Sequence, residues 1–218
     1  TRSALERFLS SVREVSEILE RNLHRTAKLV ARFKQVAVDQ SGAQRGQFML
    51  DDLVRAIGTT YQTMLSQPGI TFTHEASPGL AMDSYPQPLE QALVNLLGNA
   101  TRHAFEGRAQ GRVHLHAAAL GDDRVCITVS DDGVGIASAN LQHVFEPFFT
   151  TKLGQGSSGL GLPIAHNIVT GLLGGRILVR SEADQGCEFR IELPRVAPRL
   201  PASQASAAQS SSGPDTAS

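Results

Sequence analysis

The chain has 218 residues, 41% hydrophobic and 19% charged, so it is long enough to bury a sizeable core in one or two domains. Its formal net charge of -1 provides no basic surface for nucleic acid or for an anionic membrane. No run approaches the roughly 18 apolar residues of a membrane span, and the first residues lack a signal-peptide pattern. Cys126 and Cys187 are too few for a disulfide framework, and both lie in strand-like stretches where we expect buried, small hydrophobic residues.

The first predicted element is a long helix over residues 3–38. Ser3 and Glu6 have the spacing of a capping box, so the helix begins there. Apolar residues then recur in alternating steps of three and four, which is typical of a coiled coil or helical bundle. This seam consists of Leu5, Phe8, Val12, Val15, Leu19, Asn22, Thr26, Leu29, Phe33 and Val36. It requires partner helices, and its polar members either set the register or form a tolerated polar layer.

After a polar break at residues 39–46, the composition changes to alternating strands and helices. We expect strands at 46–50, 69–75, 112–120, 124–131, 175–182 and 186–194, and helices at 51–66, 85–106 and 160–172. This order predicts an α+β fold, a two-layer α/β sandwich with a mixed, mostly antiparallel sheet and helices on one face. Residues 198–218 are rich in Ala, Ser, Gln and Pro, so we expect a disordered tail there.

The predicted helix at 85–106 carries an unusual polar stripe within the stretch VNLLGNATRH, residues 94–103. Its core face consists of Leu89, Leu93, Leu96 and Ala100. The opposite face carries the polar residues Asn95, Asn99, Arg102, His103 and Glu106. Asparagine has a poor helix propensity and needs a reason to be there. Amide oxygens can bind a hard cation, and a guanidinium can bind phosphate. Taken alone, the stripe fits an ordinary solvated helix face better than a binding site.

A second candidate feature is SDDGVGI, residues 130–136, where a predicted strand ends. Asp131 lies where the chain leaves the sheet, and its carboxylate can accept a hydrogen bond from an exocyclic amine. Gly133 and Gly135 permit tight backbone conformations or the close approach of a ligand. An Asp-Gly turn is common, so this stretch by itself favours a simple turn.

Two further segments lie together between residues 144 and 162. GQGSSGLGL, residues 154–162, exposes backbone N–H groups before a helix, which favours anionic oxygens. It is neither a Walker A loop nor a dinucleotide fingerprint. In VFEPFFTTK, residues 144–152, the side chains of Phe145, Phe148 and Phe149 can anchor a mobile segment whose Thr150, Thr151 and Lys152 face a polyanion. The combination is typical of a lid over a nucleotide.

The order and spacing of these features resemble the sequence boxes of the histidine-kinase catalytic domain. This domain belongs to the GHKL superfamily, which includes gyrase, the ninety-kilodalton heat-shock chaperone and the MutL repair proteins. QALVNLLGNATRH resembles the N box, DDGVGI the first glycine box, FEPFF the F box and GLGL the second glycine box. The end of the chain's predicted sheet, GGRILVRSEADQGCEFRIELP, is similar to the family's closing hairpin. The resemblance covers roughly residues 46–195, and the helix in residues 1–40 resembles the second helix of the kinase dimerisation hairpin.

The resemblance implies a site for ATP and Mg²⁺ in residues 46–195. Asn99 would hold the Mg²⁺ that bridges the phosphates, with Asn95 assisting one turn earlier. Arg102 would reach phosphate oxygens and His103 the nucleoside or phosphate region. Asp131 would read the adenine amine, Gly133 and Gly135 would let the base approach, and residues 144–162 would form the ATP lid. The remaining implied ATP-binding residues are Thr150, Thr151, Lys152, Ser158, Gly159, Leu160, Gly161 and Leu162.

The family transfers the γ-phosphoryl group to a histidine on a bundle helix, usually one followed by an acidic residue. His24 is followed by Arg25, and His74 precedes Glu75 in a strand that runs into a Ser-Pro-Gly turn, which excludes a helix. We therefore expect the acceptor to lie upstream of Thr1 and this fragment not to phosphorylate itself. The resemblance further implies a homodimer through the bundle helix, a response-regulator partner and a cytoplasmic location. Full-length proteins of this family are often anchored in the inner membrane.

His114 and His116 alternate onto one face of a predicted strand and resemble a pair of metal ligands. The sequence offers no third ligand at a suitable spacing, so we expect a solvated or hydrogen-bonded face instead.

Two alternative functions follow from the same residues. NATRHA also resembles free-standing GHKL ATPases and anti-sigma-type serine kinases, but these usually place a glutamate one turn before the magnesium asparagine as general base. Here that position is Asn95, which cannot abstract a proton. A non-catalytic docking module is the second alternative, and the presence of Asn99, Asp131 and the lid glycines argues against it.

Overall fold

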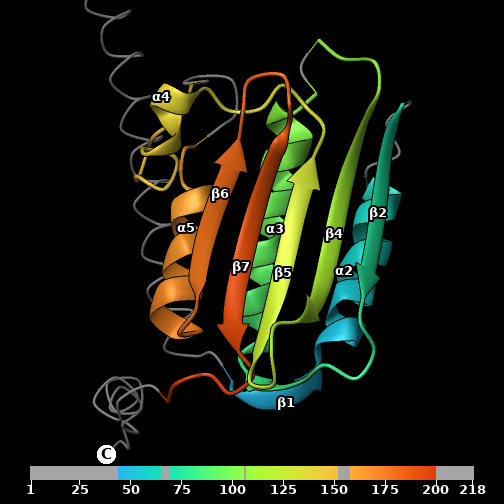
Figure 1. The fold of residues 1–218 in the computed structure, drawn as a ribbon, viewed down its shortest axis with the longest axis vertical. Helices are drawn as coiled ribbons and strands as arrows, with labels where there is room; N and C mark the ends of the chain where they lie inside the picture. The colour runs from blue at the N-terminus through green and yellow to red at the C-terminus, as the bar shows by residue number, and fades with distance from the viewer. Residues whose placement is uncertain (1–43, 65–68, 106, 152–157, 200–218) are drawn as a thin grey trace, which may run out of the picture. The chain divides into compact units, whose positions relative to one another are not determined.

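The computed structural model describes residues 44–64, 69–105, 107–151 and 158–199 (Figure 1). The helix expected over 3–38 with His24, the residues Glu106 and Lys152, and all but the first two residues of the expected tail lie outside these ranges. Within the described ranges, no helix combines the length and the apolar character needed to cross a membrane.

A five-stranded sheet forms one layer of the fold, in the order β2-β4-β5-β7-β6. Its strands are β2 (Ile70–Ala76), β4 (Gly111–Ala119), β5 (Arg124–Asp131), β6 (Arg176–Ser181) and β7 (Cys187–Pro194). β2 runs parallel to β4, and the other neighbouring pairs are antiparallel. The sheet is therefore mixed and mostly antiparallel, as expected.

Helices cover one face of this sheet (Figure 1). They are α2 (Leu50–Met64), α3 (Pro86–His103) and α5 (Gly161–Asn167), which continues as a π-helical turn, η1 (Ile168–Leu172). α3 lies behind the middle of the sheet (Figure 1), and its side chains Leu89, Leu93, Leu96, Leu97 and Ala100 are all buried. The predicted two-layer sandwich is confirmed.

The strands alternate buried and exposed side chains because the sheet is covered on one face only. On β5, Val125 and Ile127 are buried against the helices, whereas Cys126 between them is only half-buried. The expectation of a buried cysteine is thus confirmed for Cys187 and wrong for Cys126. The pleat places Cys126 on the uncovered face.

α3 ends at His103, three residues before the end predicted from the sequence. The carbonyl oxygen of Ala104 accepts a hydrogen bond from the N–H of Val134, 2.8 Å away, in place of a helical partner. Gly107 then adopts a positive φ of 75° and turns the chain toward β4. A tertiary contact therefore sets the end of this helix.

A second, two-stranded sheet lies at the end of the molecule where the described chain begins. β1 (Gly46–Met49) pairs antiparallel with β3 (Ala81–Ser84), and Asp83 also forms a bridge with Val196 near the other end of the described chain. Arg45 binds the Asp83 carboxylate through two hydrogen bonds of 2.7 and 3.0 Å. This guanidinium holds the pKa of Asp83 below its ordinary value. β3 and the short helix α4 (Ser138–Leu141) were not predicted from the sequence.

Gly58 lies inside α2, although glycine is unfavourable within a helix. The ring of His74 on β2 packs directly over it and leaves no room for a side chain. A methyl group at Gly58 would overlap that ring. We expect Gly58→Ala to lower the free energy of unfolding by about 1–3 kcal/mol through overpacking, despite the gain of about 1 kcal/mol in helix propensity. Urea unfolding followed by circular dichroism measures the change. His74→Ala should relieve the clash, so a double variant no more stable than Gly58→Ala would contradict this explanation.

Candidate functional site

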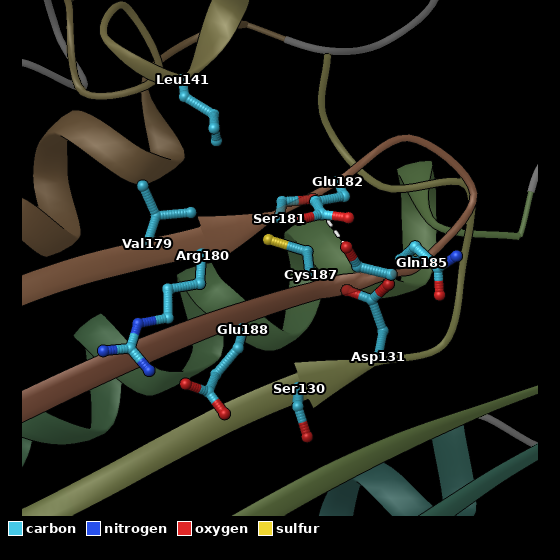
Figure 2. Close-up of a pocket in the computed structure, with 11 residues that line it drawn as sticks. Ser130, Asp131, Leu141, Val179, Arg180, Ser181, Glu182, Gln185, Cys187 and Glu188 are labelled. Carbon is cyan, nitrogen blue, oxygen red and sulfur yellow. Dashed lines mark hydrogen bonds between the residues drawn. The ribbon is translucent and has the colours of Figure 1, made fainter. Parts of the chain in front are cut away.

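A cavity of about 630 Å³ opens where the ends of β5, β6 and β7 meet, with Leu141 of α4 on its opposite side (Figure 2). Its lining consists of Ser130, Asp131, Leu141, Val179, Arg180, Ser181, Glu182, Gln185, Gly186, Cys187 and Glu188. Asp131 belongs to the site predicted from the sequence. The asparagines of α3 do not line this cavity.

Asp131 is the acidic group at the end of β5 in this cavity (Figure 2). Its carboxylate accepts hydrogen bonds from the N–H of Gly133, at 3.0 Å, and from the N–H of Cys187. Burial raises the pKa of Asp131 above its ordinary value, and the two N–H groups oppose this effect. A half-buried carboxylate with two fixed donors is a well-oriented acceptor for a ligand amine.

The glycines that follow Asp131 are required by the protein's own packing. A side chain at Gly133 would overlap Ala104 at the end of α3. Gly135 has a positive φ of 69°, and a side chain there would overlap the carbonyl of Glu182. These contacts wedge the first glycine box between α3 and the turn that joins β6 to β7. The predicted approach of a base to these glycines stays a prediction.

The closing hairpin supplies two cavity residues that the sequence reasoning did not single out. The Ser181 hydroxyl accepts a hydrogen bond from the N–H of Ile136 at 2.8 Å. It donates to the carbonyl of Gly186 at 2.6 Å (Figure 2). Cys187 pairs with both Asp131 and Ser181 across the sheet. The resemblance to the family's closing hairpin was the available signal, but it named no residue because it did not give the strand register.

The two asparagines of α3 lie half-buried one turn apart. Asn95 faces the beginning of α5, where its Oδ1 lies 3.8 Å from the position that a Cβ on Gly161 would take. Its Nδ2 is buried and has no hydrogen-bond partner. A buried amide that lacks a partner within the protein fits a site in which a bound group supplies one.

The two basic residues at the end of α3 differ in their surroundings. Arg102 is exposed and folds back along the helix, so that its Nη2 would lie 2.9 Å from a Cβ on Gly98. His103 is half-buried. Since Arg102 is on the surface with a long side chain, it can reorient toward a phosphate beside the asparagines.

The lid segment is closed at its base by backbone contacts. The N–H of Phe148 donates to the carbonyl of Gly159 at 2.9 Å, and both residues have positive φ values, of 68° and 63°. Phe145 packs against His166 and Phe189, with ring centroids 5.1 and 6.3 Å apart. The expected anchoring is therefore confirmed for Phe145.

Other lid residues divide by exposure. Phe148 is 51% exposed, so the expectation that it anchors the lid is wrong: its left-handed backbone turns the side chain outward. Leu160 is buried in the core, whereas Thr150, Ser158, Gly159, Gly161 and Leu162 are half-buried and Thr151 is exposed. The second glycine box thus places the half-buried Gly161 beside Asn95.

His114 and His116 stack with their ring centroids 6.1 Å apart. Both Nε2 atoms face Oε1 of Glu75, at 3.6 and 3.7 Å, on the uncovered face of the sheet. Among the described residues, no group of three or more His, Cys, Asp and Glu side chains has an arrangement that could hold a metal ion. A Mg²⁺ ion held by an amide oxygen and by phosphate oxygens needs no such group.

The two cysteines are expected to differ in reactivity. Burial raises the pKa of the Cys187 thiol to about 12, and the nearby Asp131 carboxylate adds to this effect. At pH 8 its thiolate fraction is then about 10⁻⁴, so iodoacetamide should modify half-exposed Cys126 and spare Cys187 in the folded chain. Mass spectrometry of the alkylated protein measures both sites, with urea-unfolded protein as the control. Equal labelling of the two thiols in the folded chain would contradict the described packing of Cys187.

Comparison with protein families gives one match that covers half of the chain. Residues 84–197 match the family described as "Histidine kinase-, DNA gyrase B-, and HSP90-like ATPase". The matched region contains α3, the cavity and the lid, and therefore the whole candidate site.

Individual relatives agree with this match. The alginate biosynthesis sensor protein KinB of Pseudomonas aeruginosa is 44% identical over 106 residues, which are 49% of this chain and 17% of KinB. The sensor histidine kinase ZraS of Salmonella typhimurium is 46% identical over 112 residues, 51% of this chain and 23% of ZraS. This chain thus spans less than a quarter of the length of these two relatives.

Among solved structures, the catalytic domain of histidine kinase ThkA superimposes with a TM-score of 0.62 at 27% identity. The superposition covers 70% of this chain and 97% of that domain.

Proposed function

Because this chain belongs to the family of histidine kinase-, DNA gyrase B- and HSP90-like ATPases, we propose that it works as the ATP-binding catalytic part of a two-component sensor histidine kinase. It would transfer the γ-phosphoryl group of ATP to a histidine on a bundle helix upstream of Thr1. A response regulator would receive the phosphoryl group, and pairing of two bundle helices would make a homodimer. The ATP-binding part would lie in the cytoplasm, where ATP is available.

The observation that carries this proposal is that both glycine boxes pack against the same helix, α3. The first is tied to the end of α3 by the 2.8 Å hydrogen bond from Val134 to Ala104. The second lies beside Asn95, whose buried Nδ2 lacks a partner. A ligand that extends from Asp131 to the asparagines would therefore have a base acceptor at one end and amides for a hydrated cation at the other.

The described residues suit phosphoryl transfer, in which positioning and charge neutralisation contribute most of the catalysis. Asn99, assisted by Asn95, would hold a Mg²⁺ ion, which neutralises charge on the phosphates when it is bound. Arg102 would add a second positive charge, and the N–H groups of Ser158–Gly161 would donate to phosphate oxygens. None of these groups is a general base, which agrees with histidine as the acceptor.

A free-standing ATPase or serine kinase remains the alternative within the same family. Both need a base beside the attacking hydroxyl or water, and Asn95 occupies the place where such relatives carry a glutamate. No described observation favours this alternative over the histidine kinase.

Incubation with ATP labelled at the γ-phosphate tests the proposal. The parent protein, with the sequence upstream of Thr1, should acquire acid-labile, alkali-stable label, whereas this chain alone should acquire none. The parent carrying Asn99→Ala is the matched control and should stay unlabelled. Label on a histidine of the isolated chain would refute the upstream acceptor, and rapid phosphate release by the isolated chain would favour the ATPase.

A further inference from the structure

Arg108, in the loop between α3 and β4, connects two segments that flank Asp131. Its Nη1 donates to the backbone carbonyl of Asp132 at 2.9 Å, and its Nη2 lies 3.0 Å from Oδ1 of Asp184. Asp132 follows Asp131 in the first glycine box, and Asp184 lies in the turn between β6 and β7. Glu182 and Gly186 of that turn line the cavity. One guanidinium therefore bridges two loops at the cavity's edge.

Backbone contacts tie the same three segments together. Val134 donates to Ala104 at the end of α3, and Asp184 donates to the carbonyl of Val134, each at 2.8 Å. Asp184 has a positive φ of 63°, which is uncommon for a non-glycine residue but which aspartate tolerates better than most. The Asp184 side chain forms an ion pair with Arg108. Loss of Arg108 would loosen the turn and the loop of Asp131 together.

We propose that Arg108 is a positioning residue for recognition of the nucleotide base, because it fixes the loop that aims the Asp131 carboxylate into the cavity. It does not touch the base, and it acts through Asp132 and Asp184. This inference rests on the proposed function, in which Asp131 accepts a hydrogen bond from the adenine amine. The family resemblance assigned no role to this position.

The positive charge of Arg108 favours the ionised form of Asp131, the form that can accept a hydrogen bond from a base. Burial is the largest influence on Asp131 and raises its pKa, and the N–H groups of Gly133 and Cys187 oppose it. Asp132 raises this pKa to a smaller extent, and Arg108, the smallest contribution, lowers it. Other charged or titratable groups in the cavity are Arg180, Glu182, Cys187 and Glu188. From β4, the residue opposite Asp131 is the uncharged Val113. Without Arg108 the pKa of Asp131 would rise slightly, so acidification would protonate the carboxylate and weaken ATP binding at a slightly higher pH.

Arg112 provides a matched control. Its Nε lies 3.1 Å from Oδ2 of Asp132, so it neighbours the same aspartate as Arg108 and carries the same charge. Its side chain is 80% exposed, and its recorded contacts are to Asp132 rather than to the turn of Asp184. The proposal therefore predicts different outcomes for two equal changes of charge.

The test is the dissociation constant of Mg·ATP, measured by calorimetry from pH 5 to pH 8. Arg108→Gln should weaken binding at pH 7 up to about fivefold, the range for a lost ion pair with the exposed Asp184, and should slightly raise the pH at which binding is lost. Arg108→Lys keeps the charge and should restore the wild-type pH profile with incomplete affinity. Arg112→Gln should match the wild type in both respects. Asp184→Asn should weaken binding without raising that pH, and it carries the test if Arg108→Gln does not fold.

Two results would overturn the inference. If the wild type binds Mg·ATP and Arg108→Gln behaves like Arg112→Gln, Arg108 does not position the site. The second result is that Arg108→Gln binds more weakly, keeps the wild-type pH profile, and gains no affinity when lysine replaces glutamine at this position. That result would show a merely structural contribution of Arg108. A wild-type chain that binds no Mg·ATP would instead refute the proposed function, and the inference with it.

Discussion

Asn99→Ala is expected to abolish measurable Mg·ATP binding while leaving the fold intact. The loss should exceed about a hundredfold in affinity, since even indirect partners of a bound metal contribute 10- to 100-fold. The fold should survive because Asn99 is half-buried on the outer side of α3, and alanine is the better helix former. Calorimetric titration measures the binding, and thermal unfolding measures the fold.

Asn167, exposed at the end of α5, offers a matched control for this change. Asn167→Ala removes the same amide from a helix that also contributes to the site region, and it should leave the affinity unchanged. An Asn99→Ala variant that still binds Mg·ATP with wild-type affinity would remove Asn99 from the site.

Asn95→Glu is expected to convert the site toward an ATPase and to raise basal ATP hydrolysis by about a hundredfold, the lower range for an added general base. Asn95 faces the beginning of α5, and its buried amide nitrogen has no partner. A carboxylate in that position would be desolvated, which raises its pKa and its strength as a base. Release of inorganic phosphate by the isolated chain is the measurement.

Asn95→Gln separates the chemistry of this change from its size. Glutamine has the length of glutamate but cannot take a proton, so its hydrolysis rate should equal that of the wild type. Equal rates for Asn95→Glu and Asn95→Gln would show that this position does not determine whether water is activated.

Much of the fold could be predicted because periodicity and turn chemistry are local signals. The stretch 124–131 alternates apolar and polar residues, and β5 begins and ends there. The seam of leucines on α3 identified its buried face in the same way. Even His74 was correctly placed in a strand, because the Ser-Pro-Gly turn that follows it is incompatible with a helix.

The features that could not be predicted depend on contacts between distant segments. β3 has four residues and exists through its pairing with β1, and the end of α3 is set by Val134. Cys126 and Phe148 depend on which face a pleat or a turn presents, which a single stretch of sequence does not decide.

The candidate site also combines residues that local motifs predict with residues that only contacts between distant segments bring together. The family boxes singled out Asp131 and the asparagines as candidates because each box is a short local motif. Cys187 pairs with Asp131 through the strand register, Ser181 pairs with Cys187, and Arg108 bonds to Asp132, the residue next to Asp131. No short stretch of sequence shows these contacts. Lys152 lies outside the described residues, so its predicted contact with ATP stays a prediction.

The most direct test of this account is a calorimetric titration of the wild-type chain with ATP, with and without Mg²⁺. We predict saturable binding of one nucleotide per chain that weakens when Mg²⁺ is withheld and disappears in Asn99→Ala. A titration that shows no binding of ATP in the presence of Mg²⁺, by a chain whose circular dichroism shows a folded α/β protein, would contradict the account.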